Sequence, residues 1–164
     1  MPRVWAIDPG NIESAYCLVE TGSCRAIAFE KMQNPELLFW MRQELPGSGA
    51  EAVAIERVAS YGMPVGREVF ETCEWIGKFA LAAEEAGMPV EYIYRRDEKL
   101  AICHSPNAND TTIRKALIDR FADHDLRTGK GTKKDPDWFY GFKADCWMAY
   151  AVAVTYIDRQ GGKA

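Results

Sequence analysis

The chain has 164 residues, of which 48% are hydrophobic and 27% are charged, and its formal net charge is −4. These values exclude a disordered chain and a two-lobed protein, and they predict one globular domain over residues 1–164. The uncharged stretches are too short to cross a bilayer, and the five cysteines are odd in number and lack the spacing of a zinc ribbon. We therefore expect a soluble, cytoplasmic protein with no membrane partner.

Short apolar runs predict strands, and helical patterns alternate with them after the third strand. Strands are predicted over residues 4–8, 15–19, 24–29, 52–56 and 90–94. Asn34 as the N-cap and Pro35 in the first helical position predict a helix that ends near residue 44. Further helices are predicted from residue 67 to 86, from a cap at Asp110 to residue 121, and over residues 144–156. This order predicts an α/β domain, a mixed sheet with helices on both faces.

Two of the predicted strands end in the same way, on an acidic side chain. The first ends in WAID at Asp8, and the fourth ends in AVAIE at Glu56. Ligand chemistry in open α/β sheets collects outside the carboxyl ends of the strands, so the two carboxylates are candidates for one site. Alternatively, each acid simply marks the solvent edge of its strand.

A third acidic residue, Asp145, precedes the uncharged run of residues 146–157. In one interpretation it only stabilises the helix that follows, as an acid near its N-terminus. In the other, alanines at positions 144, 149, 151 and 153 let this helix lie close to the sheet, which brings Asp145 toward Asp8 and Glu56.

Three carboxylates in one crevice repel one another, so a cation must compensate. Oxygen ligands favour hard ions, which predicts one or two Mg²⁺ ions with Mn²⁺ as a substitute, held by Asp8, Glu56 and Asp145. Two such ions about 3.5–4 Å apart can activate water and stabilise a leaving oxygen. The pattern therefore favours phosphodiester cleavage, with these three acids as catalytic residues.

The sequence resembles the RNase H-like nuclease superfamily and, within it, the RuvC-type Holliday-junction resolvases, including phage-borne relatives. The resemblance covers nearly the whole chain and rests on IDPG at Asp8, AIE at Glu56 and KADCWMAYAVAVT at Asp145. It implies a five-stranded mixed sheet, a homodimer and magnesium-dependent nicking of four-way DNA junctions. No nucleotide cofactor is implied.

One position departs from the pattern of cellular members of that family. They usually carry another carboxylate three residues before the last one, where this chain has Phe142. Asp135, Asp137 or water could supply the missing oxygen, and the sequence leaves these alternatives open.

Positive charge gathers in the second part of the chain. Residues 1–90 carry a formal charge of −6, whereas residues 91–164 carry +2. Two clusters are predicted to contact DNA phosphates: Lys130, Lys133 and Lys134 before the last helix, and Arg95, Arg96 and Lys99 after the last strand. A solvated loop without a partner is the alternative for the first cluster.

The loop after Glu56 carries two apolar side chains, Tyr61 and Met63, among glycines and a proline. They are predicted to lie on the side of the acids, where they could wedge between the bases of an opened junction. Packing against a helix or a dimer partner is the alternative.

The preferred interpretation is a structure-selective DNA endonuclease acting on four-way or other branched DNA. A catalytically weak or silent module that binds branched DNA or a protein partner is the second interpretation, and Phe142 favours it. Sugar-kinase-like ATPases also begin with a strand, an acid and a glycine turn, but they need a second lobe that this length excludes.

Overall fold

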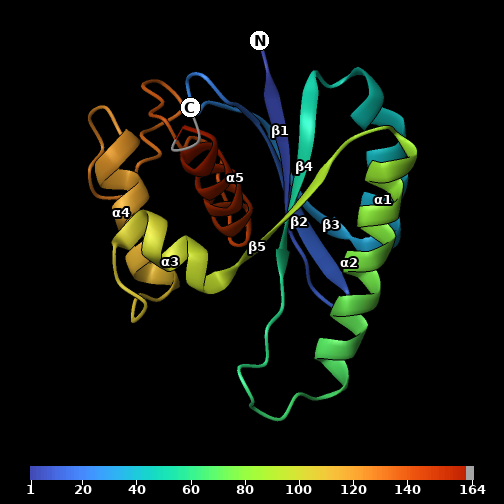
Figure 1. Cartoon of the computed structure of the whole chain (residues 1–164). Coiled ribbons are helices and arrows are strands. Elements are labelled where there is room, and N and C mark those ends of the chain that lie inside the picture. The colour runs from blue at the N-terminus through green and yellow to red at the C-terminus, as the bar shows by residue number, and fades with distance from the viewer. Residues whose placement is uncertain (162–164) are drawn as a thin grey trace.

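The computed structural model describes residues 1–161 as one mixed sheet between two layers of helices (Figure 1). The strands are β1 (Arg3–Asp8), β2 (Glu13–Glu20), β3 (Ala26–Gln33), β4 (Ala50–Arg57) and β5 (Val90–Tyr94). Their order across the sheet is β3-β2-β1-β4-β5. The pairs β1–β2 and β2–β3 are antiparallel, and the pairs β1–β4 and β4–β5 are parallel. The predicted fold class, a five-stranded mixed sheet with helices on both faces, is confirmed.

Helices cover both faces of the sheet, which Figure 1 shows edge-on. The first layer holds α1 (Asn34–Glu44), followed by a short 3-10 turn, and α2 (Arg67–Glu85). The second holds α3 (Arg95–Cys103), α4 (Asp110–Phe121) and α5 (Cys146–Gly161). Within residues 1–161, no helix combines the length and the apolar character that crossing a membrane requires.

Alternation along the strands divides the buried side chains between the two layers. In β1, Val4 and Ala6 pack with α5, whereas Trp5 and Ile7 pack with α1 and α2. Successive side chains of a strand point to opposite faces, so Asp8 lies on the α5 side of the sheet. The alternation of side chains that places Val4 and Ala6 in the core under α5 therefore also directs Asp8 to that face of the sheet.

A small polar network holds the turn that follows Asp8. The buried side chain of Asn34 donates to the Gly10 carbonyl at 2.9 Å and accepts a hydrogen bond from the Ser14 hydroxyl. A Cβ added at Gly10 would lie 2.3 Å from the Glu13 carbonyl oxygen, so only glycine fits there. Asn34 thus lies in the first turn of α1 and positions the turn, whereas the sequence predicted it as the cap.

Helix α3 was missing from the predicted element order. Its sequence, RRDEKLAIC, is only nine residues long, begins with five charged residues and follows β5 without a linker. The Asp97 carboxylate accepts a hydrogen bond from the Tyr94 backbone N–H at 2.8 Å, which satisfies one donor where the strand becomes a helix. Helix α5 begins at Cys146, later than predicted, because Ala144 has a left-handed φ of 32°.

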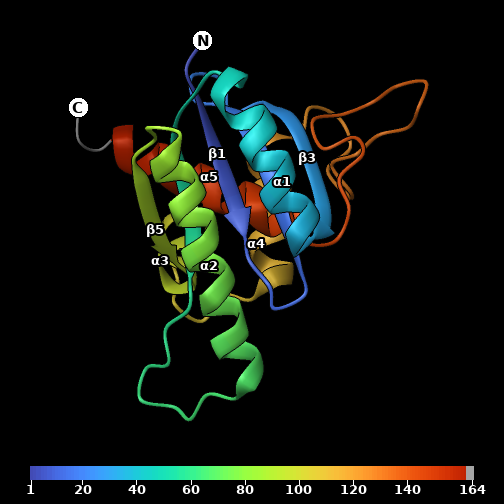
Figure 2. The same cartoon turned by 90° about the vertical axis from the view of Figure 1, so that its right-hand side faces the viewer.

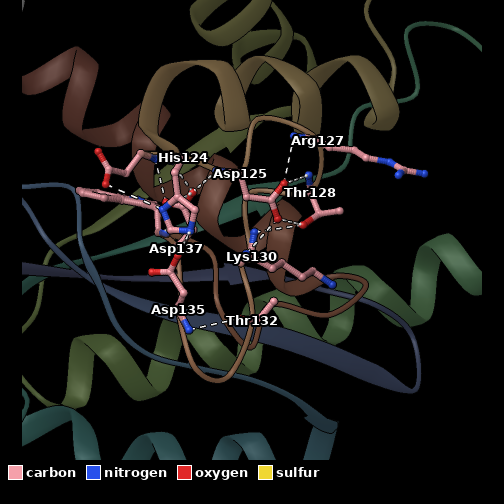
Figure 3. Close-up of polar contacts among 11 residues, drawn as sticks. His124, Asp125, Arg127, Thr128, Lys130, Thr132, Asp135 and Asp137 are labelled. Carbon is pink, nitrogen blue, oxygen red and sulfur yellow. Dashed lines mark hydrogen bonds and ion pairs between the residues drawn. The ribbon is translucent and has the colours of Figure 1, made fainter.

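The long loop between α4 and α5 is ordered by two of its own carboxylates (Figure 3). Asp137 accepts hydrogen bonds from four backbone N–H groups at 2.6–2.8 Å, those of Asp123, His124, Asp125 and Trp138. Burial alone would raise the pKa of Asp137, but these donors lower it well below its usual range. Asp125 accepts three further backbone N–H groups, from Arg127, Thr128 and Gly131.

Replacing Asp137 should therefore destabilise the protein. Asp137→Ala leaves four backbone donors without their acceptor, and we expect the free energy of unfolding to fall by about 2–4 kcal/mol in urea denaturation at pH 7. Asp123→Ala is the matched control because the Asp123 side chain is 94% exposed, and it should change stability by less than about 0.5 kcal/mol. Equal effects of the two substitutions would contradict this role of Asp137.

Candidate active site

One row of residues crosses the sheet at the carboxyl end of β1, on the face that α5 covers. Lys31 of β3 pairs with Ala15 of β2, and Ala15 pairs with Asp8 of β1. On the other side of Asp8 lies β4, in which Ile55 pairs with Ile7, so the next residue, Glu56, lies beside Asp8. Glu56 pairs in turn with Ile93 of β5. Two acids and one lysine therefore share a row, and only the small side chain of Ala15 separates Lys31 from Asp8.

Asp8 and Glu56 form the centre of the site. Burial raises the pKa of Asp8 well above its usual range, and the nearby charges of Glu56 and Asp145 raise it further. Arg95 lowers it, but less than the other influences raise it. The predicted convergence of Asp8 with Glu56 is thus present, and Asp145 is close enough to act on Asp8 electrostatically.

Asp145 lies immediately before α5 and is paired with a lysine. Its carboxylate is 2.6 Å from the Nζ atom of Lys31, and this hydrogen bond raises the pKa of Lys31. The Asp145 backbone carbonyl accepts the Ala149 N–H at 3.0 Å, so the helical hydrogen bonds start from this residue. Its side chain is 46% exposed, which leaves one side of the carboxylate open to solvent.

Glu56 is paired with an arginine in a similar way. Nη1 of Arg95 lies 3.2 Å from the Glu56 carboxylate, whose side chain is 17% exposed. The Arg95 guanidinium also contacts Asp110 at the start of α4. Arg95, predicted to contact DNA, therefore already serves as the counter-charge of a site carboxylate.

A fourth acidic side chain, Glu98 of α3, lies behind this pair. The residue is fully buried, and neither of its carboxylate oxygens receives a hydrogen bond within the described chain. Burial raises the pKa of Glu98 well above its usual range. The neighbouring Glu56 carboxyl group, which lies within hydrogen-bonding reach, and the charges of Glu56 and Asp8 raise this pKa further. Nothing in the sequence pattern marked this residue.

The oxygen donors of these acids suit a hard divalent cation, although the side chains are not already arranged as a metal-binding site. Within residues 1–161, no three Asp, Glu, His or Cys side chains stand together in an arrangement that could hold a metal ion. Asp145 and Glu56 are instead held on Lys31 and Arg95. The orphaned oxygens of Glu98 and the all-oxygen donor set still suit Mg²⁺ or Mn²⁺, provided that the carboxylates shift toward a shared ion.

The residues considered for the missing carboxylate lie elsewhere. Phe142 is 1% exposed and packs against Phe29, Phe139, Trp147 and Tyr150, so its position belongs to the aromatic core. The Asp137 oxygens are occupied by backbone donors of their own loop.

Asp135, the other acid considered, is 79% exposed and contacts His124 in the same loop (Figure 3). Both acids thus have their contacts within their own loop, and the further acid that the structure brings near Glu56 is Glu98.

Two basic clefts flank the acids. The first, of about 400 Å³, is lined by Tyr61, Arg95, Arg96, Lys99 and Pro106. It thus brings together the predicted second basic cluster and one of the two predicted apolar side chains. Met63 does not line this cleft; it is 70% exposed in the loop that extends below the sheet in Figure 1.

The second cleft, of about 490 Å³, lies on the other side of Asp145. Its basic side chains are Lys31 and Lys143, and Phe29, Glu30 and Cys146 also line it. Sequence reasoning missed Lys31 and Lys143. The strand register of β3 and the backbone turn before α5, which place them, have no local sequence signal.

The predicted first basic cluster lies in neither cleft. Lys133 and Lys134 are exposed between Gly131 and Pro136, which form a bridge across the loop, and Lys130 is partly buried before it. Figure 2 shows this orange loop extending past β3 toward the upper end of the view, whereas β1 ends below it. The structure therefore separates these lysines from the acidic row.

Comparison with solved structures identifies the fold. The chain is similar to Thermus thermophilus RuvC, with a TM-score of 0.72 and 20% sequence identity over 98% of this chain and 96% of that one. It is also similar to T. thermophilus RuvC in complex with a Holliday junction substrate, with a TM-score of 0.68 and 20% identity over 100% and 98% of the two chains. No protein-family model matches the sequence, and no curated protein matches it. The fold is that of RuvC, which agrees with the resemblance drawn from the sequence.

Proposed function

We propose that this protein is a divalent-metal-dependent endonuclease that cuts DNA at four-way junctions or similar branch points. The observation that carries the proposal is the acidic cluster of Asp8, Glu56 and Asp145 at the carboxyl end of the sheet. It occurs in a fold shared along its whole length with a protein whose structure was determined on a Holliday junction. Fold alone does not specify chemistry, so the charge cluster is the stronger argument.

In this proposal Asp8, Glu56 and Asp145 hold one or two Mg²⁺ or Mn²⁺ ions. Ions held there would supply the chemistry that activates a water and stabilises the leaving oxygen of an in-line displacement. Lys31 and Arg95 neutralise the outer acids and lie beside the clefts where the flanking phosphates would bind.

A silent binding module is the second candidate. The buried Phe142 and the absence of a ready-made three-acid cage within residues 1–161 favour it. Such a module would bind branched DNA through the same basic clefts without cutting it.

Cleavage assays decide between the two candidates. Labelled four-way junction, linear duplex and RNA–DNA hybrid are incubated with the protein in Mg²⁺, Mn²⁺ or EDTA. We expect metal-dependent nicks near the branch point of the junction, and Asp8→Asn should reduce this cutting by more than about a hundredfold because it removes a metal ligand, an effect of about 3 kcal/mol or more.

The binding of the same variant provides the control. Asp8→Asn should bind the junction at least as tightly as the unmodified protein, since it removes a charge that repels phosphate. Tight junction binding without cutting in any metal would support the silent module. Unchanged cutting by Asp8→Asn would refute the assignment of the site.

The basic side chains are proposed to bind DNA in two places. Arg96 and Lys99 line the cleft beside Glu56, close to the proposed cutting position. Lys133 and Lys134 lie on the projecting loop, where they could reach only DNA that extends away from that position. Tyr61 in the first cleft and Met63 at the loop surface are proposed to contact exposed bases.

Salt dependence tests this DNA surface. Arg96→Ala/Lys99→Ala and Lys133→Ala/Lys134→Ala should each weaken junction binding and reduce the slope of log affinity against log salt by about 2, one unit for each phosphate that is no longer neutralised. Arg42→Ala/Lys115→Ala is the control because these residues are ion-paired with Glu85 and Asp119 outside both clefts. A slope that stays the same in either test pair removes that pair from the proposed DNA surface.

A homodimer is also proposed, with α2 as the contact surface. Its outer side carries Phe70, Cys73, Gly77 and Leu81 at helical spacing, and Phe70 and Leu81 are 60% and 51% exposed. An exposed apolar stripe that includes a glycine suits close packing against a second copy, in which the same patch contacts itself. Two active sites would then face one junction.

Light scattering measures this assembly directly. The unmodified protein should have twice the chain mass of 18.5 kDa, and Phe70→Glu/Leu81→Glu should reduce it to a monomer. Leu126→Glu, at a leucine that is 55% exposed outside this stripe, should leave the dimer intact. A monomeric unmodified protein at micromolar concentration would contradict the proposed dimer.

A further inference from the structure

We propose that Glu98 is a ligand of the divalent cation at this site, supplying from α3 the carboxylate that Phe142 does not supply from α5. The inference rests on the proposed function and adds a residue and an element to its metal site. The metal site would then draw on four elements of the fold: β1, β4, α3 and the start of α5.

The burial of Glu98 is the first argument. The residue is fully buried, and both of its oxygens are without a hydrogen-bond donor in the part of the chain that the structure describes. A buried carboxylate is unfavourable unless it is paired, hydrogen-bonded or bound to a metal. No ion pair of residues 1–161 involves Glu98, and the nearby Arg95 is used by Glu56 and Asp110.

The direction of the side chain is the second argument. Residues three apart share one side of a helix, so Glu98 lies on the same side of α3 as Arg95. That side is turned toward the end of β4, because Arg95 contacts Glu56 at 3.2 Å. The carboxyl groups of Glu98 and Glu56 are close enough to hydrogen-bond if one carries a proton, and the charge of Asp8 also reaches Glu98.

The chemistry of this grouping is the third argument. Glu56 and Glu98 both offer only acceptors when ionised, so nothing in the protein bridges them except a proton or a cation. A buried acid with only a structural role would be expected to accept a hydrogen bond from a donor when ionised, or to donate its proton to a backbone carbonyl when neutral. Glu98 instead finds another site carboxylate, which is the arrangement that a hard divalent ion stabilises.

Mn²⁺ binding tests the inference without relying on cleavage. Metal-free full-length protein is titrated with Mn²⁺ by calorimetry, and thermal unfolding is measured with and without the ion. Glu98→Gln keeps the shape of the side chain but removes its charge, and we expect the Mn²⁺ affinity to fall about tenfold or more together with the metal-induced rise in melting temperature. Glu84→Gln, on the exposed side of α2, should change the affinity less than about twofold and serves as the charge-matched control.

The other variants separate this inference from the proposed function. Glu98→Asp keeps the charge on a shorter side chain and should bind Mn²⁺ more tightly than Glu98→Gln, which provides a readout if the glutamine variant folds poorly. If Asp8→Asn weakens Mn²⁺ binding while Glu98→Gln and Glu98→Asp bind as the unmodified protein does, the role of Glu98 is overturned and the metal site stands. If the unmodified protein binds no Mn²⁺, both proposals are overturned.

Discussion

The organisation of this protein depends on the gathering of negative charge at one end of its sheet. Two unit charges 4 Å apart repel by about 4 kcal/mol at an effective dielectric near 20, so several carboxylates cannot share such a place without cations. Asp8 sits at the centre, where burial and its acidic neighbours raise its pKa. Lys31 and Arg95 hold the outer acids, Asp145 and Glu56, by direct contacts. The charge balance of the site is therefore part of the fold itself.

The fold brings these charges together by ordinary packing. Strand alternation turns Asp8 and Glu56 to the face under α5, and the parallel pairing of β1 with β4 places them side by side. The small residues Ala149, Ala151 and Ala153 are fully buried in α5 and let the helix lie close to the sheet. Its start, with Asp145, is thereby held above the same row of strand ends. Asp8 and Asp145 are more than a hundred positions apart in the sequence, and they come together because each lies at the end of a regular element whose core face is fixed.

Because the three acids lie at the ends of regular elements, the sequence could predict them. Apolar runs ending in an acid marked Asp8 and Glu56, and the long uncharged helix marked Asp145. Glu98 and Lys31 could not be found in this way, because α3 is short and rich in charged residues and the place of Lys31 depends on the register of β3. The basic loop shows that closeness in sequence can mislead. Lys133 and Lys134 are near Asp145 along the chain, but they lie outside both clefts.

The aromatic core and the position of the acids constrain each other. Phe142 packs among Phe29, Phe139 and Trp147, so a charge at its position would be buried without a partner. Glu98 places a carboxylate near Glu56 from the other side, where α3 closes over the strand end. A divalent ion bound among these acids would take over the charge balance now provided by Lys31 and Arg95. Lys31 and Arg95 each line one of the two clefts, so their charge would then be available to phosphates bound there, and metal binding and DNA binding would support each other.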